Sequence, residues 1–194
     1  MNNDLILKIY SLPQSVFTLS ELSLIFPEIA YPNLRRRMRY FTKAGKLKRL
    51  HQGIYAKKEY NALELANKLY KPSYISLETV LVNKGVVFQY YERIFAVSYL
   101  TREVKINDIA IQYRQIKESV LTNMQGIENK DGYFIASLER AFLDALYIYK
   151  DYHFDNLSVL NWENVFKLQV IYKSKALSKR VKDYYKDFLK DNVK

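Results

Sequence analysis

The stretch PNLRRRMRYFTKAGKLKRLHQGIYAKK, residues 32–58, combines dense positive charge with a regular apolar pattern. It holds ten Lys or Arg residues and neither Asp nor Glu. At about 100° per residue, Leu34, Met38 and Phe41 lie on one side of a helix. The pattern therefore predicts a helix that begins after an N-cap at Asn33 and presents its basic residues on the other side.

The second half of the stretch changes to the alternation that is typical of strands. Gly45 is suited to end the helix, and "KLKRL" and "IYAKK" then flank "HQG", a short connection that contains Gly53. Two such runs joined by a short Gly-containing connection predict a β-hairpin.

The residues before this stretch predict two shorter helices. Leu5, Ile6 and Ile9 indicate a first helix that ends near Pro13. The segment from Thr18 to Glu21 has the form of a capping box, in which each of the two side chains bonds the other residue's backbone amide, and a second helix follows it.

Three helices followed by a basic hairpin is the order of elements in a winged helix-turn-helix, whose third helix enters the major groove of DNA. We therefore expect residues 1–60 to form a winged helix-turn-helix DNA-binding domain. The alternative is an ordinary charged solvent face on a helical domain.

The helical wheel divides the basic residues by role. Arg36, Arg39 and Lys43 point away from the apolar stripe and are expected in a groove, with Arg35 and Tyr40 on the shoulders. The hairpin residues are expected mainly on phosphates, and His51 lies at the hairpin tip. The predicted DNA-binding set is Arg35, Arg36, Arg39, Tyr40, Lys43, Lys46, Lys48, Arg49, His51 and Lys57.

Composition agrees with a nucleic-acid partner. The chain has 194 residues, a net charge of +11, 49% apolar residues and no cysteine. Residues 1–60 and 167–194 carry most of the excess positive charge around a nearly neutral centre. The apolar content excludes a disordered chain, and we see neither a signal peptide nor a membrane span, so we expect a cytoplasmic protein with no membrane partner.

Residues 61–194 alternate between helical and strand patterns. "RIFAVSYL" and "IAIQYRQI" predict strands, and "YFIASLERAFLDALYIY" predicts a short strand that leads into a helix capped by Ser137. "SYISLETVLVNKGVVFQ" predicts a helix capped by Ser76 and then a strand. With two closing helices, this is an α+β domain with a small, mainly antiparallel sheet and C-terminal helices.

The last predicted helix, within residues 174–191, has an apolar face and a lysine-rich outer face. That outer face could be an ordinary solvent face or a second nucleic-acid surface.

The search for catalytic chemistry finds no candidate. Two isolated histidines without cysteine give no zinc spacing, and there is no Gly-rich phosphate loop, no G-x-S-x-G elbow and no nuclease-type acidic pattern. We therefore expect a protein that is not an enzyme and has no catalytic residues, metal or cofactor.

One polar group is unusual in an otherwise apolar helix. Arg140 and Asp144 have the spacing of a helical ion pair, and Glu139 lies next to them in the first turn. A structural ion pair and a contact surface for a partner both remain open.

Three segments together resemble a known family. "LKRLHQGIYAK", "KPSYISLETVL" and "ASLERAFLDAL", in this order and spacing, resemble the AbiEi family of bacterial antitoxins over nearly the whole chain. The resemblance implies a type IV toxin–antitoxin system. In it, the winged helix represses its own operon at promoter inverted repeats, and the C-terminal domain counters a nucleotidyltransferase toxin without a stable complex. The residues that match the antitoxin-domain motif are Tyr74, Ser76, Glu78, Glu139, Arg140 and Asp144.

Two rival functions differ from this expectation. The first is a stand-alone winged-helix transcriptional regulator whose C-terminal domain senses a ligand or a partner. The second is a nuclease targeted by a winged helix, against which the missing metal-binding pattern argues.

Overall fold

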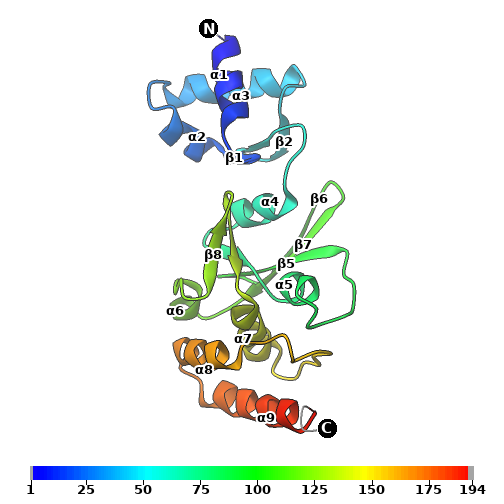
Figure 1. Ribbon diagram of the computed structural model, residues 1–194. Helices are drawn as coiled ribbons and strands as arrows, with labels where there is room; N and C mark the ends of the chain where they lie inside the picture. The colour runs from blue at the N-terminus through cyan, green and yellow to red at the C-terminus, as the bar shows by residue number, and fades with distance from the viewer. Residues whose placement is uncertain (1, 192–194) are drawn as a thin grey trace.

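The computed structural model describes residues 2–191, which form a mixed α+β fold with two sheets. The N-terminal helices and the smaller sheet occupy one end of the molecule (Figure 1). The larger sheet lies in the middle, and the last helices form the other end, so the two chain termini are far apart (Figure 1).

The N-terminal unit contains three helices and a three-stranded antiparallel sheet of order β1-β3-β2. Its elements are α1 (Asn2–Ser11), β1 (Val16–Thr18), α2 (Leu19–Ile25), α3 (Tyr31–Lys43), β2 (Lys48–His51) and β3 (Ile54–Ala56). The capping box of α2 and the β2–β3 hairpin are confirmed. The strand β1 was not predicted, because three residues are too few to show a periodicity.

The start of α3 corrects one prediction. The helix begins at Tyr31 with Ala30 as N-cap, so Asn33 is a residue of the first turn and not the cap. Pro32 makes this start favourable, since a first-turn residue needs no backbone N–H donor. The predicted inward stripe of Leu34, Met38 and Phe41 is confirmed, because all three side chains are fully buried.

The three-stranded sheet is covered on both faces. Phe17 and Tyr55 pack with the core of α1, α2 and α3, whereas Val16 and Ile54 pack into the larger core of the C-terminal unit. The alternation follows from the strand, in which successive side chains point to opposite faces. One face of the sheet therefore packs against the N-terminal helices and the other face packs against the C-terminal unit.

The C-terminal unit is built on a mixed six-stranded sheet of order β6-β7-β5-β4-β9-β8. Three neighbouring pairs are antiparallel and two, β5–β7 and β4–β9, are parallel, so the sheet is larger and less uniformly antiparallel than expected. Its strands are β4 (Ser73–Ile75), β5 (Arg93–Ser98), β6 (Arg102–Ile106), β7 (Ile109–Gln115), β8 (Ile127–Lys130) and β9 (Tyr133–Ala136).

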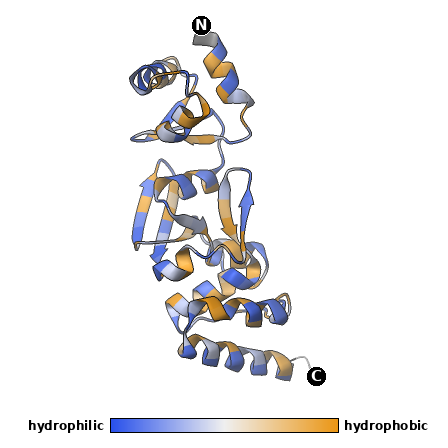
Figure 2. Cartoon of the chain, turned by 90° about the vertical axis from the view of Figure 1, so that its left-hand side faces the viewer, coloured by the Kyte–Doolittle hydropathy of each residue, from blue (hydrophilic) through white to orange (hydrophobic). Residues whose placement is uncertain are grey.

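Helices cover this sheet and extend it toward the C-terminus. They are α4 (Ala62–Leu69), α5 (Glu78–Asn83), α6 (Glu118–Leu121), α7 (Leu138–Tyr149), α8 (Trp162–Leu168), the 3-10 turn η1 (Gln169–Tyr172) and α9 (Lys175–Asp191). Along α9, hydrophobic and hydrophilic residues alternate as expected for one packed face and one solvent face (Figure 2). Leu177 and Val181 are buried on its inner side, and Lys179 and Lys182 are exposed.

One segment of the C-terminal unit was predicted only in part, because the helix before Gly85 is present as α5 but its cap and the segment after it differ. Residues 73–75 form the strand β4, and Ser76 does not cap α5, whose N-cap is Leu77. The segment after Gly85 is not a strand, because the N–H groups of Val86 and Val87 both turn back to the carbonyl of Leu81. Their β-branched side chains are buried in the core, so burial and not strand pairing accounts for the apolar run.

Two carboxylates join the N-terminal unit to α4. Glu64, only 3% exposed, accepts hydrogen bonds from the backbone N–H of Ser15 (2.9 Å) and of Val16 (2.8 Å) and from the Ser15 hydroxyl (2.8 Å). Glu21 at the start of α2 pairs with Lys68 (2.8 Å) and Lys71 (2.7 Å). The units are thus held together by polar bonds as well as by the shared sheet.

Candidate nucleic-acid interface and the buried polar cluster

The outer face of α3 carries the predicted groove residues. Arg35, Arg36, Arg39 and Lys43 are all exposed, and about half of Tyr40 is exposed. The buried stripe holds the opposite side of the helix in the core, so these side chains project away from the protein. Arg36 makes a local hydrogen bond of 3.2 Å to Asn33.

The β2–β3 hairpin lies directly after α3 along the chain and adds further basic groups. Lys48 and Arg49 are exposed on β2, and His51 is exposed where β2 ends at the turn. The pairing register shifts between Arg49 and His51, so the hairpin is irregular next to its turn. The face of α3 and the hairpin together form the candidate interface.

Three of the predicted phosphate contacts have other interactions. The Lys57 ammonium donates to the carbonyl of Leu12 (2.6 Å) and lies over the ring of Phe17, so it links the end of the hairpin to the loop after α1. The Lys48 ammonium lies 5.4 Å from the centre of the Tyr60 ring. The half-buried Lys46 accepts a hydrogen bond from the Tyr10 hydroxyl on its carbonyl (2.7 Å).

Four of the six residues of the antitoxin-domain motif meet in one buried polar cluster. Arg140 and Asp144 on α7 form the predicted ion pair, with 3.4 Å between Nε and Oδ1, and both side chains are fully buried. The hydroxyls of Tyr74 and Ser76, at the end of β4, donate to Asp144 Oδ2 at 3.0 and 2.8 Å. The hydroxyl of Tyr172 donates to Oδ1 at 2.6 Å.

The guanidinium of Arg140 is held by backbone oxygens as well. It donates to the carbonyls of Val120 (2.7 Å), Asn123 (3.3 Å) and Gln125 (2.8 Å), which belong to α6 and the loop after it. The rings of Tyr74 and Tyr172 also stack near the guanidinium. One side chain thereby joins α7 to α6 and its following loop, and through Tyr74 to β4.

Burial and pairing act in opposite directions on this cluster. Burial raises the pKa of the Asp144 carboxyl, whereas Arg140 and the three hydroxyl donors lower it. Burial and the nearby Asp144 raise the pKa of both Tyr74 and Tyr172, so these phenols remain hydrogen-bond donors. Arg140 and Asp144 have no exposed surface, which favours the structural interpretation of their pair over a contact surface.

The other two motif residues lie apart from the cluster. The buried Glu78 accepts from the Tyr149 hydroxyl (3.1 Å), and its burial raises its pKa. Glu139 accepts from the backbone N–H of Asn161 (3.3 Å), the N-cap of α8. Each therefore joins two segments of the fold.

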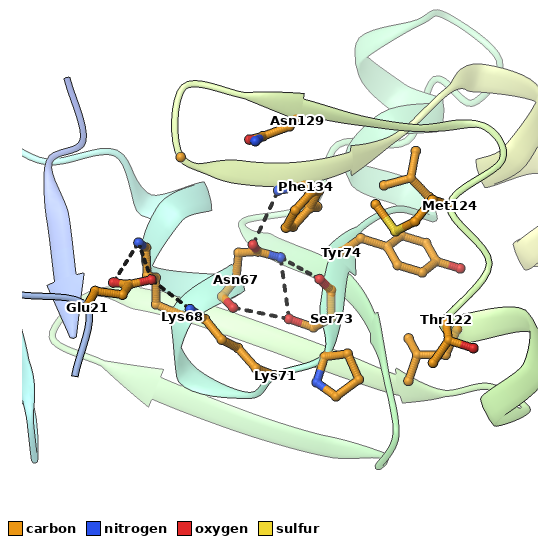
Figure 3. Close-up of a pocket in the computed structure, with 14 residues that line it drawn as sticks. Glu21, Asn67, Lys68, Lys71, Ser73, Tyr74, Thr122, Met124, Asn129 and Phe134 are labelled. Atoms are coloured by element: carbon orange, nitrogen blue, oxygen red, sulfur yellow. Dashed lines mark hydrogen bonds and ion pairs between the residues drawn. The ribbon is translucent and has the colours of Figure 1, made fainter. Parts of the chain in front are cut away.

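A pocket that sequence reasoning missed lies beside the junction of the two units. It is lined by residues of α2, α4, β4, the loop after α6 and the β8–β9 hairpin. Lys68 and Lys71 converge on Glu21 at one end, and Phe134, Met124 and Tyr74 lie along the rest (Figure 3). No local pattern marks such a site, because its walls come from segments far apart in the sequence.

Neither a metal site nor a membrane span is found between residues 2 and 191. That part of the chain contains no group of three His, Cys, Asp or Glu side chains placed to hold a metal ion. None of its helices is both long enough and apolar enough to cross a bilayer.

Comparison with models of known protein families and with curated proteins finds no match for this chain.

Proposed function

We propose that this chain is a winged-helix transcriptional repressor of its own operon and the antitoxin of a type IV toxin–antitoxin system. The observation that carries the DNA-binding part is the outer face of α3, where Arg35, Arg36, Arg39 and Lys43 are exposed. No acidic residue interrupts residues 32–58, so all the charges within this stretch are positive.

The two basic elements have different roles in this proposal. Arg36, Arg39 and Lys43 on α3 read base edges in the major groove, because a helix of this size fits that groove. Arg49 and Lys48 on the hairpin contact phosphates, which orient the protein and set the salt dependence of binding. Lys57 serves the fold instead, since its ammonium already bonds the carbonyl of Leu12.

The antitoxin part rests on the resemblance to the AbiEi family. The segments "KPSYISLETVL" and "ASLERAFLDAL", which carry that resemblance, meet through the bonds of Tyr74 and Ser76 to Asp144. This supports the interpretation of the two segments as one structural signature. Because the cluster is buried, its four motif residues serve the fold, and toxin neutralisation uses other residues of the C-terminal unit.

The test separates the two activities with point variants of the full chain. Arg36→Ala with Arg39→Ala removes two charges from α3, and Lys84→Ala with Lys105→Ala removes two exposed charges from the C-terminal unit as a matched control. Repression is measured with a reporter under the chain's own promoter. Antitoxicity is measured by co-expression with a nucleotidyltransferase encoded beside the gene.

We expect the α3 variant to lose repression and keep protection, and the control variant to keep both. Full repression by the α3 variant contradicts the DNA-binding part. Failure of the wild-type chain to protect cells from the neighbouring nucleotidyltransferase contradicts the antitoxin part.

A further inference from the structure

The pocket beside the junction has the size and the lining of a small-molecule site. Its volume of about 680 Å³ falls within the range of ligand pockets. Leu121 and Tyr74 form buried apolar walls, and Met124 and Phe134 remain 53% and 38% exposed. Apolar side chains gathered around a hollow together with a few polar groups are the usual lining of a ligand pocket.

The polar end of the pocket has an excess of positive charge. Lys68 and Lys71 both contact the Glu21 carboxylate, so two ammonium groups share one anion. The Lys68 side chain is only 8% exposed, whereas that of Lys71 is 52% exposed and open to solvent. Asn67 and Ser73, next to them, already bond each other and the backbone. A second anion would therefore be attracted to the ammonium groups and would compete with Glu21 for them.

We propose that this pocket binds a small amphipathic anion: a planar apolar body between Phe134, Met124 and Leu121, and a carboxylate or sulfonate at Lys71 and Lys68. The charge at one end and the aromatic and aliphatic walls at the other define this class of ligand. The proposal goes beyond the DNA-binding and antitoxin function and does not rest on it.

The probe for this site is 8-anilinonaphthalene-1-sulfonate, an aromatic sulfonate that becomes fluorescent in apolar surroundings. Titration of the full chain is expected to give saturable binding at one site. Lys71→Met removes the ammonium but keeps the apolar stem and should weaken binding about tenfold, as expected for loss of a charge-assisted contact. Lys84→Met, at an exposed lysine outside the pocket, is the matched control and should leave binding unchanged.

Two further variants test the geometry. Met124→Trp, at an exposed position, fills the apolar part of the pocket and should abolish the saturable phase. Glu21→Gln removes the competing anion and should tighten binding, roughly threefold to tenfold. Circular dichroism verifies that each variant is folded.

The proposal is overturned by the absence of saturable binding to the wild-type chain. It is equally overturned if Lys71→Met and Met124→Trp both bind the probe as the wild type does, because the probe then binds elsewhere, for example at the exposed Phe88 and Tyr90.

Discussion

Gly126 shows how closely the backbone approaches the buried polar cluster. Its φ of +72° lies in the region that favours glycine, and a Cβ there would stand 3.1 Å from both Arg140 Cβ and Leu168 Cδ1. Its carbonyl also accepts from the backbone N–H of Ser137 (2.7 Å), the N-cap of α7. The loop that holds Arg140 therefore depends on the absence of a side chain at this position.

Gly126→Ala is expected to lower the free energy of unfolding by roughly 2–3 kcal/mol, from the unfavourable φ and the steric overlap together. Gly85→Ala is the matched control, with a φ of +71° but no atom within 4 Å of the added Cβ. Gly85→Ala should lower the free energy of unfolding by only about 1 kcal/mol. Urea unfolding of both variants measures the difference, and equal losses would show that packing at Gly126 contributes nothing.

The Arg140–Asp144 pair gives a second residue-scale prediction. Asp144→Asn leaves the guanidinium buried without its counter-ion and should lower the free energy of unfolding by about 3–5 kcal/mol. Arg140→Met should lower it by a similar amount, because it leaves the carboxylate buried without its counter-ion. The double variant should lose clearly less free energy of unfolding than the two single variants combined, since neither charge is left unpaired. Urea unfolding completes this cycle, and additive losses would contradict a direct interaction.

At this scale the sequence predicts the pair but not its surroundings. The spacing of Arg140 and Asp144 places them on the same side of one helix, which is local information. Their partners Tyr74 and Tyr172 are far away in the chain, and nothing in the periodicity of either segment marks them. Long-range hydrogen bonds follow from the folded topology.

Among the elements, α2 carries a carboxylate in its first turn, Glu21, whose pKa is shifted far from its ordinary value. Burial raises the pKa of the Glu21 carboxyl, but hydrogen bonds from Lys68, Lys71 and the Thr18 backbone outweigh that effect and lower it to about 2. Its folded-state pKa is thus below the value of 4.5 for the free side chain. The stabilisation is fully present above pH 4.5 and disappears as the pH falls toward 2.

Glu21→Gln is therefore expected to lower the free energy of unfolding by about 1–2 kcal/mol at pH 7, after allowance for partial exposure. The difference in free energy of unfolding between wild type and variant should disappear as the pH is lowered from 4.5 toward 2. Glu59→Gln, at an exposed glutamate between β3 and α4, is the matched control and should show no such difference in stability. A constant gap across this pH range would mean that the charge of Glu21 is not the cause.

The elements that were predicted well are those with a sustained local pattern. The helices α3, α7 and α9 each carry an apolar stripe over three turns or more. The N-cap of α5 was predicted one residue too early, at Ser76 instead of Leu77, and the Ser76 hydroxyl bonds Asp144 instead. The apolar run at Val86 was taken as a strand, since a buried turn and a buried strand have the same composition.

At the scale of the whole molecule, the two units depend on each other. The boundary between residues 60 and 61 falls at the start of α4, where Glu64 bonds Ser15 and Val16 and where one face of the three-stranded sheet is buried. The sequence indicates a change of pattern at this position. It does not reveal the shared core, because the pattern of a strand shows its buried positions but not what covers them.

Glu64→Ala in the full chain is expected to lower the free energy of unfolding by about 2–3 kcal/mol. The reason is that it leaves the buried N–H groups of Ser15 and Val16 without their acceptor. Residues 61–194 alone should be less stable still, because Glu64 and the apolar surface against Val16 and Ile54 are uncovered. Urea unfolding of both proteins tests this. A fragment as stable as the full chain would show that the junction contributes nothing.

The interface predicted for DNA also belongs to this scale, because it combines α3 with the hairpin. Arg49→Ala should weaken binding to every DNA sequence alike and reduce the slope of log affinity against log salt by about 1. Fluorescence anisotropy at several salt concentrations, with promoter and scrambled fragments, measures both quantities. A loss confined to the promoter fragment would contradict a phosphate contact.

The most direct measurement is the affinity of the full chain for its own promoter fragment at moderate salt, compared with the Arg36→Ala/Arg39→Ala variant. The account predicts that the wild type prefers this fragment to scrambled DNA and that the variant loses about thirtyfold or more, as expected for two base contacts of at least about 1 kcal/mol each. The Lys84→Ala/Lys105→Ala control should bind nearly as the wild type does. Undiminished promoter affinity of the Arg36→Ala/Arg39→Ala variant would contradict the central claim that the outer face of α3 binds DNA.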